Sequence, residues 1–441
     1  MKFSSHQQQM EGLISWKRVS FGLLALVSIQ AVFLSTPWIK SSRGASPNFD
    51  VSSPNCEAEQ SATLRTTGAA LTASQCATHF PDLYHEVDRA TGYWKKQLRR
   101  LISPEDVDIS WRNDGALRIL IHQNELRVLQ TKGVWSNSYR ERALSVLSQL
   151  EEALWSASAA GEILPTIEAA IVVDDMSLIP TKQGDTHSIW TFTSTDRDPA
   201  HQRHWLIPGF SFYSAPGTGS FIDAQRRALQ HDSPIVDKVQ QAIWRGVRWT
   251  NPDVRGSLLD STVNKTWADV KEVNWETKEN LMDMEEMCKF AYVIHTEGRS
   301  YSGRLQFLLN CDAAPIIHRL DWKCHYYHLL VSKGPKQNYI PVKAHFGDLE
   351  KTMDWYLEHP EESQRIANNS IATFRSKYFT PAATSCYLRR LIKGYGEVAF
   401  TPEVLRPEKA GEVRKRRGIS FAEIVHMKEE YEGDGVNDEE A

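Results

Sequence analysis

The segment from residue 290 to residue 317 constrains the fold of this chain more than any other. It reads FAYVIHTEGRSYSGRLQFLLNCDAAPII, which is an apolar run, a loop from Thr296 to Gly303, a helix-like stretch and a second apolar run. Short apolar runs bounded by turn residues and separated by a helical stretch predict a strand–loop–helix–strand unit. The loop then lies at the carboxyl end of a buried strand, where open α/β sheets bind ligands.

The composition of this loop favours a phosphate ligand. Ser302 is expected to cap the following helix, whose free N–H groups and partial positive charge suit an anion. Arg304 adds a guanidinium group that matches phosphate oxygens, and Gly298 and Gly303 let the backbone approach a ligand closely. The segment therefore predicts a diphosphate site. The alternative is a glycine loop that binds nothing, as in many α/β proteins.

The remaining sequence predicts two α/β domains. A chain of 441 residues is too long for one typical core, and strand-like and helical segments alternate along most of it. We expect an N-terminal domain at 76–235 and a C-terminal domain at 236–398, both with parallel sheets, and a charged tail at 399–441. Local signals include a hairpin turn at Gln123-Asn124, a helix start at Asn251-Pro252 and a capping box from Ser420 to Glu423.

The first residues predict a membrane anchor. Residues 19–39 carry no charge and are long enough to cross a bilayer, so we expect a cytosolic tail at 1–18, an anchor at 19–39 and a stem at 40–75. A cleaved signal peptide is the alternative. In this orientation the remainder is lumenal, in the Golgi or endoplasmic reticulum. Six cysteines then permit three disulfides in 15 connectivities, and Asn264 and Asn368 are glycosylation sequons.

Charge and spacing weigh against nucleic-acid and metal sites. A net charge of −4 argues against a general nucleic-acid binder, and the basic run at 414–417 is expected to be a solvated face. The Asp-x-Asp pairs at 106–108 and 196–198 do not close a clear apolar strand, and the histidines at 325 and 328 lack a third ligand. We therefore predict no metal site. Core packing is expected for the nearby aromatic residues Trp322, Tyr326 and Tyr327, with stacking on a sugar or uracil as the alternative.

Several segments together resemble one enzyme family. EGRSYSGRLQFLLNCDAAPIIHRLDWKCHYYHLL, IEAAIVVDD, HWLIPGFSFYSAP and AIWRGVR are similar to blocks of glycosyltransferase family 90, in the family's order, within about residues 110–395. That family includes Rumi-type protein O-glucosyltransferases and fungal capsule-associated xylosyltransferases. The resemblance implies a GT-B fold, with two Rossmann-like domains facing a cleft. It also implies an inverting transfer of xylose or glucose from a UDP-sugar to a hydroxyl of a glycan, lipid or protein.

The resemblance also implies roles for individual residues. Asp175 is the expected general base, with Asp174 as the less favoured choice, and Met176-Ser177 stand where the family more often has a proline. Donor contacts are expected from these residues: Arg304, Gly303, Ser302, Arg245, Gly246 and Gly298. A disulfide is expected between Cys288 and Cys311, and Cys386 should pair with Cys76 rather than Cys56. No metal cofactor is expected to be obligatory, although Mn²⁺ could stimulate the reaction.

Two further readings of the sequence stay open. One is a lumenal carbohydrate-binding or quality-control protein that keeps this fold but has lost catalysis. The other is a glycoside hydrolase, which would need two facing carboxylates and no nucleotide. Affinity for UDP and transfer from a UDP-sugar distinguish these two readings from an active glycosyltransferase.

Overall fold

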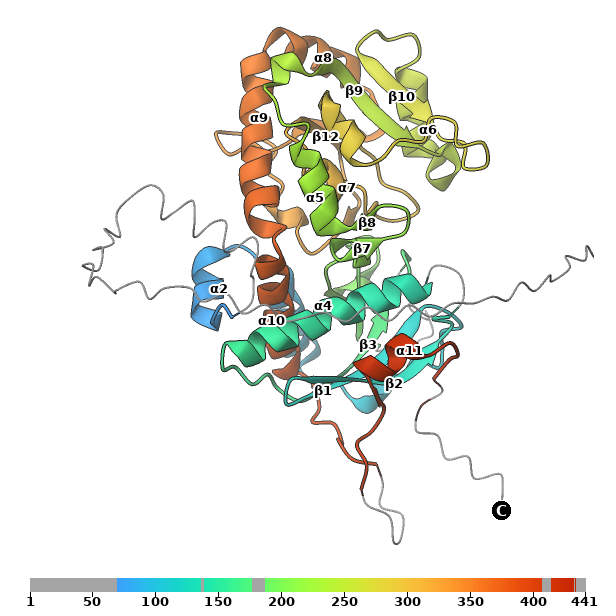
Figure 1. Cartoon of the computed structure of the whole chain (residues 1–441), viewed down its shortest axis with the longest axis vertical. Coiled ribbons are helices and arrows are strands. Elements are labelled where there is room, and N and C mark those ends of the chain that lie inside the picture. Colours follow the sequence, from blue (N-terminus) through green and yellow to red (C-terminus); the bar gives the residue numbers. More distant parts are fainter. Residues whose placement is uncertain (1–69, 136–138, 177–186, 407–413, 432, 434–441) are drawn as a thin grey trace, which may run out of the picture. The chain divides into compact units, whose positions relative to one another are not determined.

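The computed structural model describes residues 70–135, 139–176, 187–406, 414–431 and 433. The predicted cytosolic tail, the predicted anchor and the stem up to residue 69 lie outside these ranges. Within them, no helix is both long enough and apolar enough to cross a membrane. The described chain is a mixed α/β structure with two main sheets (Figure 1).

The first sheet has six strands in the order β15-β2-β1-β3-β4-β6. Its strands are β1 (Ala116–His122), β2 (Glu125–Lys132), β3 (Ile167–Val172), β4 (Ile189–Thr191), β6 (Trp205–Leu206) and β15 (Ile419–Ser420). Strands β3, β4 and β6 are parallel, whereas β1 and β2 are antiparallel to their neighbours. The expectation of a parallel sheet in both halves is thus wrong for part of the first half. The physical reason is the predicted turn at Gln123-Asn124, where both residues have positive φ and close a tight hairpin.

The second sheet has five strands, all parallel, in the order β10-β9-β11-β12-β14. Its strands are β9 (Val239–Gly246), β10 (Ala268–Glu272), β11 (Phe290–His295), β12 (Ala314–His318) and β14 (Ile340–Val342). Alternate residues of β11 enter different cores, with Ile294 on one face and Val293 on the other. Burial of both faces is typical of a parallel sheet covered by helices. The predicted strands FAYVIH and APII are both confirmed.

Helices and short ribbons complete the described chain. The helices are α2 (Ala73–His79), α3 (His85–Tyr93), α4 (Tyr139–Ala159), α5 (Phe221–Leu229), α6 (Pro252–Ser261), α7 (Leu305–Leu308), α8 (Leu349–Glu358), α9 (Pro360–Thr373), α10 (Pro381–Gly396) and α11 (Phe421–His426). The short strands are β5 (Ser194–Thr195) with β13 (Trp322–Lys323), and β7 (Ser214–Ala215) with β8 (Gly219–Ser220). Helix α9 packs on the second sheet and α10 on α4, so the chain returns to the first sheet near residue 380 (Figure 1).

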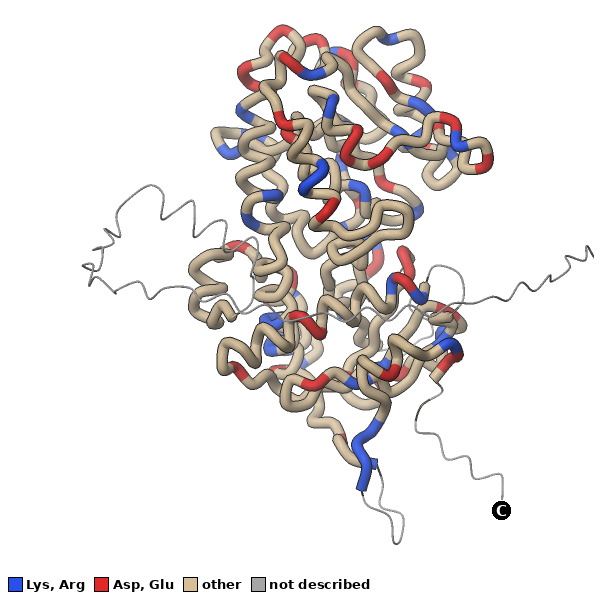
Figure 2. The backbone as a smooth tube through the Cα atoms, in the orientation of Figure 1, with Lys and Arg blue, Asp and Glu red and all other residues tan. Residues whose placement is uncertain are grey.

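Part of the predicted charged tail belongs to the first sheet. Strand β15 pairs with β2, and the capping box from Ser420 to Glu423 begins helix α11 as predicted. The basic run ends beside acidic side chains, since Arg416 pairs with Glu125 and Arg417 with Glu168. Figure 2 shows Lys and Arg interspersed with Asp and Glu over the described chain. The basic run is therefore paired and solvated, as its sequence indicated.

Candidate active site

In the second sheet, the order in which successive strands are added changes direction between β9 and β11. Numbered along the chain, its strands have the order 2-1-3-4-5, so the crossovers leave in opposite directions from these two neighbours. A crevice outside the carboxyl ends of such strands is the usual ligand site of an open α/β sheet. Strand β9 ends at Arg245-Gly246, and β11 ends directly before the predicted loop from Thr296 to Gly303.

Backbone and side-chain hydrogen bonds hold this loop. The amide of Gly298 donates to the carbonyl of Ser300 at 3.0 Å, and Asn251 Nδ2 donates to the carbonyl of Gly298 at 3.0 Å. Ser300 Oγ donates to the carbonyl of Asp175 at 2.6 Å. The loop at the end of β11 therefore contacts both the start of α6 and the segment after β3.

The helix after the loop is shorter than predicted. Helix α7 covers only Leu305–Leu308, its N-cap residue is Arg304, and no side chain caps it. The prediction that Ser302 caps a longer helix is therefore wrong. The segment closes as short turns instead, with the amide of Leu305 donating to the carbonyl of Ser302 at 3.3 Å. One turn of helix carries little dipole, so positive charge at this site has to come from side chains.

Arg304 supplies one such charge. Its guanidinium donates to the carbonyl of Arg245 at the end of β9, and its Nε is buried without a hydrogen-bond partner among the described residues. Burial, together with repulsion from Arg255, lowers the pKa of Arg304 to about 10. The group stays protonated at neutral pH, but its charge is poorly compensated.

Arg255 supplies a second charge that the sequence reasoning missed. It lies in the first part of α6, where its Nε donates to the carbonyl of Glu297 at 3.0 Å and its Nη1 to the carbonyl of Val247 at 3.2 Å. A Cβ at Gly298 would come within 3.3 Å of its Nη2, so this glycine makes room for the guanidinium. Burial lowers the pKa of Arg255 to about 10. The predicted helix start at Asn251 was the signal that could have placed this arginine at the crevice.

The two arginines form an uncompensated cationic pair. Among the described residues, no carboxylate lies within ion-pairing distance of either group. Two like charges that are buried or half-buried repel each other and lose hydration, which costs free energy in the unliganded protein. A ligand with two adjacent negative charges offsets that cost, and a diphosphate fits this description.

Arg245 lies at the predicted strand end, and its contact with the donor stays a prediction. Its guanidinium turns to β10, where Nη2 donates to Asp269 Oδ2 at 2.6 Å. The Arg245 guanidinium is therefore already paired with a carboxylate. The backbone carbonyl of Arg245, and not its side chain, contacts Arg304. A Cβ at Gly246 would lie 2.6 Å from the Trp244 ring, so Gly246 accommodates that ring. At Gly303 a Cβ would lie 3.4 Å from Ser211 Oγ, which is ordinary contact.

The two candidate bases follow β3 and differ in exposure. Arg142 Nη1 donates to Asp175 Oδ1 at 2.9 Å, and the Asp175 side chain is 48% exposed. Arg112 Nη2 donates to Asp174 Oδ2 at 3.1 Å, and that side chain is 24% exposed. Both have a cationic partner, but Asp175 is the more accessible carboxylate and its backbone touches the loop through Ser300.

A buried carboxylate joins the loop to the next strand end. Glu297 is 2% exposed, and its Oε1 accepts hydrogen bonds from the amides of Asp321 at 2.9 Å and Trp322 at 2.8 Å. The amide of Glu297 donates to His318 Nε2 at 3.1 Å. Burial raises the pKa of Glu297 to about 7, although the two amides oppose the shift. Sequence patterns gave no indication of this contact.

The weaker candidates have structural contacts. Asp106 accepts a two-point contact from Arg100, Asp196 pairs with Lys323, and Asp198 caps a turn through the amide of Ala200. His325 is buried among aromatic rings, and His328 Nε2 contacts the carbonyl of Asp82. Tyr326 and Tyr327 belong to the main core as predicted. Within the described ranges, no three His, Cys, Asp or Glu side chains come together as metal ligands would.

The two predicted disulfides are confirmed. Cys288 bonds to Cys311, and Cys76 bonds to Cys386, with Cα–Cα distances of 4.8 Å and 5.7 Å. The second bond joins α2 to α10, which are far apart in sequence. Cys324 is a buried free thiol, and Cys56 lies outside the described residues. The sequons are at exposed positions, Asn264 in a turn with positive φ and Asn368 on α9, and their glycosylation stays a prediction.

Comparison with known proteins gives one matching family. The model of glycosyl transferase family 90 matches residues 74–431, a longer stretch than the motifs alone indicated. Mouse (Mus musculus) protein O-glucosyltransferase 3 is 26% identical over 129 residues, which is 29% of this chain and 25% of that protein. Rat (Rattus norvegicus) protein O-glucosyltransferase 1 is 22% identical over 258 residues, covering 53% of this chain and 63% of that protein. The chain thus matches between about a quarter and two thirds of these relatives' length.

Proposed function

This chain belongs to glycosyltransferase family 90, and from that premise we propose that it is an inverting glycosyltransferase. The proposed donor is a UDP-sugar carrying xylose or glucose, and the acceptor is a hydroxyl of a glycan, lipid or protein. The proposed architecture is GT-B, with the donor at the second sheet and the acceptor on the side of the first. The names of the relatives, all protein O-glucosyltransferases, support glucose as the first donor to test.

One observation carries the proposal. Arg255, which is buried, and Arg304, which is half-buried with a buried Nε, place two guanidinium groups without a carboxylate partner among the described residues where strand order reverses. A glycoside hydrolase has no need for such a pair, because no diphosphate enters its reaction. A transferase needs it, since negative charge develops on the departing UDP.

The proposed chemistry follows from the same contacts. The acceptor oxygen attacks the anomeric carbon of the sugar as the bond from that carbon to the diphosphate oxygen breaks. Asp175 accepts the hydroxyl proton, a role that typically accelerates reactions about 10²–10⁴-fold. Arg142 orients the Asp175 carboxylate. Ser300 bonds to the Asp175 backbone and so joins it to the loop from Thr296 to Gly303, called the donor loop below. Arg255 and Arg304 stabilise the UDP anion that leaves.

The proposed setting is the lumen of the Golgi or endoplasmic reticulum, on a single-pass type II membrane protein. Two disulfides support an oxidising compartment. The proposed anchor at 19–39 rests on its sequence alone. The competing proposal, an inactive lumenal carbohydrate-binding protein, would keep the same fold and cysteines.

A donor screen followed by a transfer assay tests the function. We expect UDP and one UDP-sugar, glucose or xylose, to raise the thermal unfolding midpoint of the full chain. That sugar, radiolabelled, should then move to an acceptor or to water, and Asp175→Asn should abolish the transfer while keeping the thermal shift. A thermal shift without any turnover in the unsubstituted protein would favour the inactive binding protein. No shift with any UDP-sugar would contradict the proposed function.

A further inference from the structure

A pocket lies between α4, the β7–β8 ribbon and the start of α10, and neither Arg255 nor Arg304 is among its lining residues. It has a volume of about 360 Å³, which is at the lower end of the range for small-molecule sites. Its lining residues are Gln149, Glu152, Phe212, Tyr213, Ser214, Ser220, Phe221, Ile222, Phe379, Pro381 and Thr384. None of these residues was singled out from the sequence.

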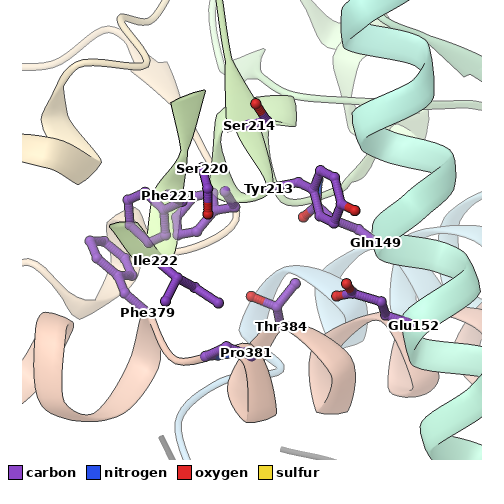
Figure 3. Close-up of a pocket in the computed structure, with 11 residues that line it drawn as sticks. Gln149, Glu152, Tyr213, Ser214, Ser220, Phe221, Ile222, Phe379, Pro381 and Thr384 are labelled. Atoms are coloured by element: carbon purple, nitrogen blue, oxygen red, sulfur yellow. The ribbon is translucent and has the colours of Figure 1, made fainter. Parts of the chain in front are cut away.

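The pocket has a polar side and an apolar side. In Figure 3, Gln149 and Glu152 of α4 lie across the space from Phe221, Ile222 and Phe379. Thr384 is between the two groups in this view, and the hydroxyl groups of Ser214 and Ser220 also line the space. This combination of apolar faces with carboxylate, amide and hydroxyl oxygens suits a ligand that has apolar faces and several O–H groups.

Two polar groups in the pocket lack partners. Gln149 is 4% exposed, and its Oε1 has no hydrogen-bond partner among the described residues, while its Nε2 donates to the carbonyl of Gly209 at 3.3 Å. Glu152 is an exposed residue that forms no ion pair or hydrogen bond with any described residue, and partial burial raises its pKa. A buried acceptor without a donor, such as Gln149 Oε1, costs free energy, and a ligand that donates a hydrogen bond to it removes the cost.

We propose that this pocket binds one sugar unit of a glycan, at a site separate from the catalytic crevice. Sugar hydroxyls donate to the Glu152 carboxylate and to Gln149 Oε1, and the apolar face of the ring packs against Ile222 and Tyr213, which are partly exposed. A lone metal ion fits poorly, because Glu152 is the one carboxylate that lines the pocket among the described residues.

The loop from Gly209 to Tyr213 separates this pocket from the donor loop. On the pocket side, the carbonyl of Gly209 accepts from Gln149, and Phe212 and Tyr213 line the space. Toward the donor loop, Ser211 Oγ lies 3.4 Å from where a Cβ of Gly303 would be. A glycan held in the pocket is therefore near the enzyme's reaction site without occupying it, which raises the local concentration of acceptor ends.

Saturation-transfer-difference NMR on the full chain with excess UDP tests the site. The probes are methyl β-glucoside and methyl β-xyloside, with n-butylamine as a cationic competitor. We expect a sugar signal that persists with UDP, and an affinity at least tenfold weaker in Glu152→Gln and in Thr384→Val. Glu151→Gln is the matched control, because Glu151 bonds to Trp155 and does not line the pocket, and it should bind as the unsubstituted protein does.

Three results would overturn the proposal. They are no sugar signal in the presence of UDP, equal sugar affinity in both pocket variants and the control, or tighter binding of butylamine than of either sugar. Unfolding midpoints of the variants, measured in the same buffer, separate a lost site from a lost fold. The affinity for UDP, measured separately, tests the proposed transferase function, so failure of one claim is distinguishable from failure of the other.

Discussion

At the scale of single residues, the candidate site is defined by side chains whose charges the protein itself does not neutralise. Arg255 and Arg304 lack carboxylate partners among the described residues, whereas Arg245, predicted beside them, pairs with Asp269. Among the acidic candidates, Asp106, Asp196 and Asp198 are used in structural contacts, while Asp174 and Asp175 each have an arginine partner beside the site. Exposure and contact with the donor loop favour Asp175 among those that remain.

Asp175→Asn should leave UDP affinity within about twofold and lower the transfer rate by at least about 10²-fold, because the amide cannot accept the proton. Asp174→Asn is the matched control, since it changes the neighbouring carboxylate that is bound to Arg112, and it should lower the rate far less. Steady-state kinetics with the identified donor measure both. The reverse order of effects would assign the base to Asp174.

Glu297 should make stability depend on pH. Its pKa is raised to about 7, mainly by burial, with Asp321 adding to the shift and the amides of Trp322 and Asp321 and the Arg197 charge opposing it. The folded state therefore binds this proton more tightly than the unfolded state, and the contribution to stability is full below about pH 4.5 and lost as pH rises through 7. The shift from 4.5 to about 7 corresponds to at most roughly 3–4 kcal/mol.

Chemical denaturation at pH 5 and pH 8 checks this prediction. Glu297→Gln keeps an oxygen for the two amides but has no proton to lose, so it should remove part of the pH dependence. Taking the difference between the two proteins isolates Glu297, because His318, whose pKa burial lowers to about 4, gives a slope of opposite sign in both. Parallel pH profiles for the variant and the unsubstituted protein would contradict the assignment.

At the scale of elements, sequence patterns correctly predicted those strands, turns and caps that depend on interactions between neighbouring residues. The strands at 290–295 and 314–318, the hairpin at Gln123-Asn124 and the cap at Ser420 all depend on neighbouring residues and were predicted correctly. The length of α7 was not, because its turns depend on how the 296–304 loop is held by Asn251 and Asp175, which are distant in sequence. Apolar residues alone, as in RLQFLLN, do not determine whether turns extend into a helix.

The end of β9 offers a test at this scale. Gly246→Ala should destabilise the protein by about 1–3 kcal/mol, because its Cβ would lie 2.6 Å from the Trp244 ring in a buried, well-packed region. Gly347→Ala is the matched control, since nothing lies within 4 Å of its added Cβ. Urea denaturation compares the two variants. Equal midpoints would show that the Trp244 ring can move aside.

At the scale of the whole molecule, the candidate site depends on contacts that sequence patterns do not reveal. The Ser300–Asp175 contact joins residues 125 positions apart, and Arg255 reaches the crevice only because α6 begins beside the 296–304 loop. The order of the five parallel strands places these segments together. The family resemblance predicted Arg304 and Asp175. For Arg255 the predicted helix start at Asn251 was the available signal, whereas the Glu297 contact had no signal in the sequence.

The proposed reaction should proceed without a divalent metal ion. Arg255 and Arg304 already provide positive charge for the departing diphosphate, so transfer should survive excess EDTA, and added Mn²⁺ or Mg²⁺ should stimulate it only modestly. The assay compares rates in EDTA with rates after metal is restored. Complete loss in EDTA with full recovery by Mn²⁺ would contradict this prediction and return Asp196 and Asp198 to consideration as ligands.

Calorimetric titration with UDP tests the central claim, that Arg255 and Arg304 form a diphosphate site. We predict that Arg304→Ala and Arg255→Ala each weaken UDP binding at least about tenfold, by losing a charged hydrogen bond, while Arg226→Ala, an exposed arginine paired with Asp223, leaves it unchanged. The unliganded Arg304→Ala protein should still unfold cooperatively. UDP affinity that is the same in all three variants would contradict the account.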